Sequence, residues 1–109
     1  MQTNSFRTIT DLSQFNGRVY VYLPTGELAA QFMQQAEAEG FSFGDGAKPT
    51  ERLATEVMAV NPDRTINYVG ATGHMAFGAG VKTVGGHPLL RMTFTGSVFS
   101  PYKGNAREK

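Results

Sequence analysis

The stretch RVYVYLPTGELAAQFMQQAEAEG, residues 18–40, decides the fold, because a strand pattern leads directly into a helix pattern. Its first six residues are mostly β-branched, aromatic or aliphatic, and they lie between Gly17 and Pro24. A run of this composition between two such residues is typical of a β-strand. Both sides of the strand carry apolar side chains, so we expect it in the middle of a sheet.

The second half of this stretch has the pattern of an amphipathic helix. Thr25 is a residue type that caps helices, and Glu27 places a negative charge where the helix dipole favours it. Gly40 can end the helix in a left-handed conformation. The apolar side is formed by residues spaced four apart and widened by Met33: Leu28, Phe32 and Ala36.

Two carboxylates at the end of this helix oppose the dipole. Glu37 and Glu39 lie where negative charge is unfavourable. We expect solvation to offset this cost, and the alternative is a nearby cation such as Lys48 or Arg52.

Two further strand patterns flank a short turn and predict a hairpin. Residues 55–60 and 65–69 are rich in β-branched and apolar residues, and NPDR at 61–64 separates them. Proline suits the first corner of a type I turn and aspartate the second. A last strand is predicted over residues 89–95, where large apolar side chains alternate with polar ones.

The remaining segments give weaker signals. Residues 1–16 predict either a short helix or a strap against the core, and residues 41–43 predict a short strand. Residues 70–86 are rich in glycine, so we expect a mobile loop, with residues 75–77 able to extend a strand. Residues 97–109 are expected to form a flexible tail.

The order of these elements predicts one domain over residues 1–109 with an α+β fold. We expect a small antiparallel or mixed sheet of about four to five strands, with one main helix packed on one face. The 109 residues carry a net charge of +1, which argues against direct binding to DNA. The chain has no cysteine, no pattern of a signal peptide and no apolar run of membrane-spanning length. We therefore expect a soluble protein of the cytoplasm.

Catalytic patterns are weak. His74 and His87 are the two histidines, and a catalytic pair would need a carboxylate or hydroxyl close by, which Asp45 or Ser42 could supply only if the fold brings them there. No spacing of His, Asp and Glu matches a metal-ligand set, so we predict neither a metal nor a cofactor. The run GAGVKT at 78–83 departs from a phosphate-binding P-loop, because Val81 separates the glycine from Lys82. A simpler nest of backbone N–H groups aided by Lys82 stays open beside a plain loop.

Aromatic residues are the stronger functional signal, and they have two interpretations. They form core and sheet surface, or they form a platform next to arginine and lysine. Such a platform suits a planar anionic ligand such as a nucleotide, and it suits a protein partner equally well. The candidate ligand-binding residues are Tyr68, His74, Phe77, Lys82, Arg64, Arg91, Gly44 and Gly46. Asp45, between two glycines, is read as a turn residue.

Two stretches, YVYLPTGELAAQFMQQAEAEGFSFGDGAKP at 20–49 and TINYVGATGHMAF at 65–77, carry a resemblance. They resemble small uncharacterised proteins of phages and mobile elements in gut Firmicutes, over residues 18–77, while the glycine-rich residues 78–86 depart from that pattern. The resemblance implies a non-enzymatic binding protein that antagonises bacterial immunity in the cytoplasm of the host.

Three modes of action stay open. The first is sequestration of a small nucleotide signal, with a homo-oligomer forming the pocket. The second is inhibition of a host defence protein, such as a Cas nuclease, by blocking it. The third is a small nucleotide hydrolase with His74 as general base.

Overall fold

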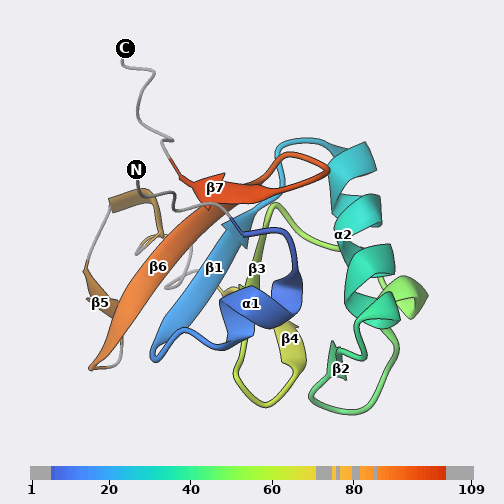
Figure 1. Ribbon diagram of the computed structural model, residues 1–109, viewed down its shortest axis with the longest axis horizontal. Coiled ribbons are helices and arrows are strands. Elements are labelled where there is room, and N and C mark those ends of the chain that lie inside the picture. The colour runs from blue at the N-terminus through green and yellow to red at the C-terminus, as the bar shows by residue number, and fades with distance from the viewer. Residues whose placement is uncertain (1–5, 71–74, 76, 80–81, 85, 103–109) are drawn as a thin grey trace.

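The computed structural model describes residues 6–70, 75, 77–79, 82–84 and 86–102. The helical elements are α1 (Ile9–Ser13), α2 (Gly26–Ala38) and the 3-10 helix η1 (Pro49–Glu51). The strands are β1 (Arg18–Tyr22), β2 (Ser42–Phe43), β3 (Val57–Val60), β4 (Thr65–Tyr68), β5 (Thr83–Val84), β6 (His87–Phe94) and β7 (Phe99–Pro101). Figure 1 shows α2 at one side of the sheet and α1 in front of the strands.

The strands form a mixed sheet. Six of them follow the order β2-β4-β3-β1-β6-β5, and β7 pairs with β6 away from this path. The β1–β6 and β2–β4 pairs are parallel, and the other pairs are antiparallel. The predicted α+β class and the mixed sheet are confirmed. The predicted strand number of four to five is wrong, because β5 and β7 are too short to show a periodic pattern in the sequence.

The strand β1 lies inside the sheet, as its apolar pattern predicts. It pairs with β3 on one side and with β6 on the other. Val19 and Val21 belong to the main core, whereas Tyr20 belongs to a second cluster on the opposite face. Since successive side chains of a strand point to opposite faces, the sheet buries apolar residues on both sides.

The helix α2 begins and ends close to where the sequence predicts. The Thr25 hydroxyl accepts a hydrogen bond from the Leu28 N–H at 3.1 Å, and Gly40, past the helix end, has φ of +87°. The Phe32 ring contacts Phe94 and Phe99 edge-on, with ring centroids 6.2 and 6.3 Å apart. The main core therefore joins α2 to the C-terminal strands.

The carboxylates at the end of α2 are held mainly by hydrogen bonds, and the predicted nearby cation contributes only at Glu37, where the charge of Lys48 is a minor cause of the lowered pKa. The Glu39 carboxylate accepts from the N–H groups of Ile9 (3.1 Å) and Thr10 (2.7 Å), and from the Thr10 hydroxyl (2.7 Å). It also accepts from the Gln35 side-chain amide at 2.7 Å. Glu37 accepts from the N–H and hydroxyl of Thr50. Both carboxylates thus bind neighbouring segments to the C-terminal end of α2.

The N-terminal segment contains both of the predicted alternatives, a short helix and a strap against the core. Ile9 and Leu12 of α1 are fully buried, and the Thr8 hydroxyl caps the helix by accepting from the Asp11 N–H at 3.0 Å. Before the helix, Phe6 forms an isolated antiparallel bridge with Phe99. This segment therefore covers the main core.

In two segments, the residues that the structure describes differ from the sequence prediction. Met75 and residues 77–79 are helical, so the predicted strand extension does not form at Met75 and Phe77, and Thr83–Val84 pair with β6 as β5. The predicted tail begins later than residue 97, because Phe99–Pro101 pair with β6 and Phe99 is fully buried. Residues 103–109 lie outside the described part of the chain.

Candidate functional site

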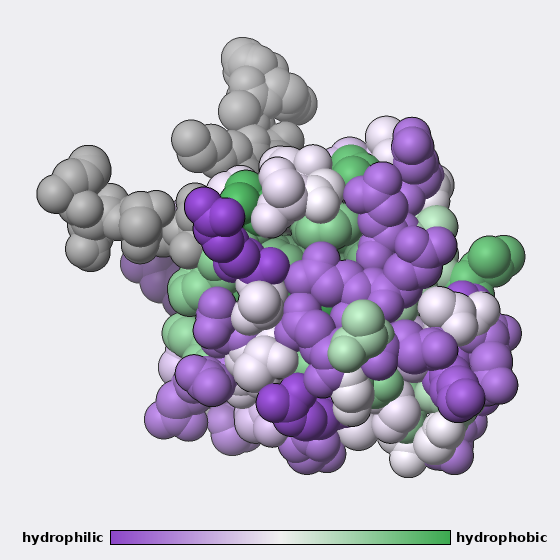
Figure 2. Space-filling model, turned by 45° about the vertical axis from the view of Figure 1, so that its right-hand side comes forward, coloured by the Kyte–Doolittle hydropathy of each residue, from purple (hydrophilic) through white to green (hydrophobic). Residues whose placement is uncertain are grey.

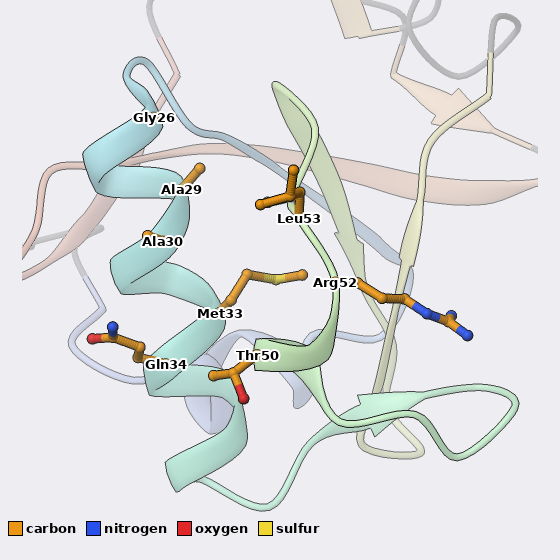
Figure 3. Close-up of a pocket in the computed structure, with 9 residues that line it drawn as sticks. Gly26, Ala29, Ala30, Met33, Gln34, Thr50, Arg52 and Leu53 are labelled. Carbon is orange, nitrogen blue, oxygen red and sulfur yellow. The ribbon is translucent and has the colours of Figure 1, made fainter.

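An apolar groove runs between α2 and residues 50–54, the segment that leads from η1 towards β3. Its volume is about 360 Å³. We call it the α2 groove, and its lining residues are Gly26, Ala29, Ala30, Met33, Gln34, Thr50, Arg52, Leu53 and Ala54. Figure 3 shows Met33 reaching from the helix towards the opposite wall, with Leu53 above it.

Small residues make this groove. Gly26, Ala29 and Ala30 follow one another along α2 and present no side chain larger than a methyl group. Met33, which is buried, closes the bottom. Leu53 on the opposite wall is 89% exposed, the highest value among the large hydrophobic residues in the described part of the chain. The groove therefore combines open space with an uncovered aliphatic side chain.

The polar groups at one end of the groove already have partners. Figure 3 shows the Arg52 side chain extending away from α2. Its guanidinium pairs with Asp45 at 2.7 Å and lies 4.6 Å from the centroid of the Phe43 ring. The hydrogen bond from Arg52 lowers the pKa of Asp45, and the hydrogen bond from the Thr50 hydroxyl lowers the pKa of Glu37. These groups hold the wall in place and leave the groove itself apolar.

A second hollow of about 250 Å³ continues from the α2 groove. It shares Gly26, Ala29 and Ala54 with the groove and adds Leu23, Pro24, Thr25, Thr55 and Glu56. Figure 2, which turns the α2 side of the molecule forward, shows hydrophobic patches set in a mainly hydrophilic surface. An apolar core with a polar rim is the anatomy of a protein-binding surface.

Two of the predicted ligand-binding residues lie together on the opposite side of the sheet from the main core. The Arg91 guanidinium donates to the Phe77 carbonyl at 2.6 Å and lies 5.2 Å from the centroid of the Tyr102 ring. The rings of Phe77 and Tyr102 are 4.3 Å apart, and Tyr22 contacts both. Phe77 is only 4% exposed, so it packs against its own chain.

Tyr68 lies elsewhere, beside the main core. Its ring is 5.3 Å from Phe43, and its hydroxyl donates to the Leu53 carbonyl at 2.9 Å. Gly44 and Gly46 lie in the turn after β2, where Gly46 has φ of +91°. The Gly46 N–H donates to the Phe43 carbonyl at 2.8 Å, so this N–H stabilises the turn and is not open to a ligand.

The other predicted residues are spread over the molecule. Arg64 has φ of +68°, and its guanidinium donates to the Glu39 carbonyl at 2.9 Å and the Thr10 hydroxyl at 3.3 Å. Lys82 is exposed, and His74 lies outside the described residues. The structure thus brings Phe77 and Arg91 together and places Tyr68 and Arg64 in separate surroundings.

The sequence reasoning missed the α2 groove. Much of its lining is glycine and alanine, which carry no chemical signal in the sequence. Among the described residues, no three His, Asp or Glu side chains gather as metal ligands do, and no helix is long and apolar enough to cross a bilayer.

No protein-family model matches the chain, and neither the curated proteins nor the solved structures contain a match.

Proposed function

We propose that this chain is a non-enzymatic binding protein that antagonises bacterial immunity by occupying a protein component of a defence system. The observation that carries the proposal is the α2 groove with Leu53 uncovered on its wall. The resemblance of residues 18–77 to small phage proteins supports the class of partner and an action in the cytoplasm of the host bacterium. A Cas nuclease is one such partner.

The chemistry of the groove favours a protein partner over a nucleotide. No aromatic ring lines it, so a base would have nothing to stack on. The Arg52 guanidinium, which could hold a phosphate, is bound to Asp45. An aliphatic side chain, by contrast, would be buried between Leu53, Met33 and Ala29. Full burial of a leucine side chain contributes about 1.5–3 kcal/mol, so covering Leu53 would favour association with a partner.

The substitution Leu53→Lys is expected to weaken binding to the partner at least about tenfold, which corresponds to about 1.4 kcal/mol. The lysine removes the apolar contact and places a charge that must be desolvated on binding. Because Leu53 is 89% exposed, we expect the free energy of unfolding to stay within about 0.5 kcal/mol of the wild type. Affinity is measured by biolayer interferometry against purified defence effectors, with inhibition of each effector's activity as the second readout.

The matched control is Met75→Lys, which changes another large hydrophobic residue that is 72% exposed and does not line the groove. It is expected to leave affinity and inhibition unchanged. If Leu53→Lys inhibits as well as the wild type, or if both variants lose activity equally, the groove is not the contact surface.

Sequestration of a nucleotide signal is the second candidate, and the Arg91 cluster favours it. Phe77 is buried, but the Tyr102 ring is only partly buried, and the Arg91 guanidinium lies 5.2 Å from its centroid. A cation beside such a ring is a pairing that can hold a base and its phosphate. Thermal-shift measurements with cyclic oligonucleotides and ADP-ribose derivatives test this candidate. A ligand at 100 times its Kd adds about 2.7 kcal/mol of stability, and Arg91→Gln should remove that gain.

Recovery of the stabilising nucleotides intact after incubation would set a binder apart from the third hypothesis, a hydrolase. No stabilisation by any of these compounds would leave the protein-blocking mode. The predicted homo-oligomer is tested by light scattering with and without ligand.

A further inference from the structure

A hollow with several polar side chains in its lining lies at one end of the sheet, apart from the α2 groove. Its volume is about 230 Å³, and it is lined by Asn16, Gly17, Arg18, Asn61, Pro62 and His87. We propose that this hollow binds the free hydrogen phosphate ion.

Strand pairing brings the polar side chains of the hollow together. The β1–β3 register pairs Val19 with Val60, so Arg18 lies across from Asn61 at the next position. The parallel β1–β6 register pairs Arg18 with Leu89, and His87 lies two residues before Leu89 on the same face. The three side chains therefore converge although they come from distant parts of the sequence.

The loop before β1 is held against β6 by a close backbone approach. A Cβ atom at Gly17 would lie 2.4 Å from the Pro88 carbonyl oxygen, a distance that real Cβ atoms do not reach. Only glycine permits this approach, which places Asn16 and Arg18 beside His87. The hollow is thus built on a fixed backbone.

The hollow offers positive charge. Arg18 supplies a planar set of N–H donors that matches the oxygens of a phosphate, and His87 adds an imidazole. Arg18 and His87 form no ion pair with the carboxylates in the described part of the chain. Asp63, in the adjoining turn, is exposed and accepts a hydrogen bond from the Thr65 hydroxyl.

Asn61 supplies the selectivity. Its side-chain N–H₂ donates to the Thr65 hydroxyl at 3.1 Å and to the Asn67 Oδ1 at 2.8 Å, so both hydrogens are used. What Asn61 can still offer a ligand is the acceptor Oδ1. An acceptor beside Arg18 and His87 suits an anion that carries a proton of its own. Hydrogen phosphate has such a proton at neutral pH, and sulfate does not.

The test is a titration of the ¹⁵N-labelled protein with inorganic phosphate, followed by NMR at constant ionic strength. We expect saturable shifts of the Gly17, Arg18 and Asn61 amide signals with a Kd in the millimolar range, and binding of sulfate at least about fivefold weaker. Arg18→Gln is expected to weaken phosphate binding about tenfold. The control Arg7→Gln changes an exposed arginine outside the hollow and should bind as the wild type does.

Two further ligands separate free phosphate from a phosphate ester. AMP, whose phosphate is mostly a dianion without a proton at neutral pH, should bind as weakly as sulfate, and adenosine should not bind, because no aromatic ring lines the hollow. Three results would each overturn the proposal: shifts that do not saturate, equal binding of sulfate and phosphate, or a Kd that Arg18→Gln leaves unchanged. None of these measurements depends on the α2 groove.

Discussion

Replacing Gly17 by alanine is expected to lower the free energy of unfolding by about 2–3 kcal/mol. The new Cβ would lie 2.4 Å from the Pro88 carbonyl oxygen and 2.7 Å from the Phe15 ring. The first of these neighbours is backbone of β6, so relief requires the strand itself to move. Urea denaturation followed by circular dichroism measures the loss.

Gly44→Ala is the matched control for this experiment. A Cβ at Gly44 meets no atom within 4 Å, and its φ lies outside the left-handed region. We expect a change of at most about 0.5 kcal/mol. Equal stabilities of the two variants would mean that the loop before β1 does not press against β6.

Replacing Glu39 by alanine is expected to cost about 2 kcal/mol, the second-largest effect. The carboxylate accepts hydrogen bonds from Ile9, Thr10 and Gln35, and so joins α1 to the end of α2. Hydrogen bonds to a charged group contribute about 1.5–3 kcal/mol, and partial exposure of Glu39 keeps the total near the low end. Glu56→Ala, at an exposed carboxylate, serves as the control.

The same carboxylate makes stability depend on pH. Partial burial raises the pKa of Glu39, but the hydrogen bonds from Gln35, Thr10 and Ile9 outweigh this, so the pKa falls below the ordinary 4.5. A lowered carboxyl pKa stabilises the fold above the unfolded value, and the stabilisation is lost as the pH falls through the folded value. Between pH 7 and pH 3 the wild type should therefore lose more stability than Glu39→Ala. An equal loss in both proteins would contradict this role of Glu39.

The sequence predicted the elements whose signals are local. The Thr25 cap, the spacing of Phe32 and Ala36, and the turn at Pro62 all act over a few residues, and the corresponding helix and hairpin form where expected. The parallel pairing of β1 with β6 could not be predicted in this way, because it joins residues about 70 positions apart. The sequence predicts a tail at Phe99, because the three residues of β7 are too few to show the alternating pattern of a strand.

The candidate site was harder to predict than the fold. Aromatic and basic residues are common in binding sites, so the sequence predicts them as ligand contacts. In the structure, however, Phe77 is buried against Tyr102, and Arg64 donates a hydrogen bond to the end of α2. The α2 groove arises from side chains that are missing at Gly26, Ala29 and Ala30. Empty space between two elements depends on their distance in the fold, and no residue pattern encodes it.

The place of β6 between β1 and β5 has a consequence for how the chain folds during synthesis. Until residues 87–94 have left the ribosome, β1 has an open edge on the side where β6 will pair. The residues before position 87 can form α2 and the β3–β4 hairpin but cannot complete the sheet. Contacts of such long sequence separation slow folding. The nascent chain therefore exposes a strand edge until its last strands emerge, a period in which it is open to aggregation and to chaperones.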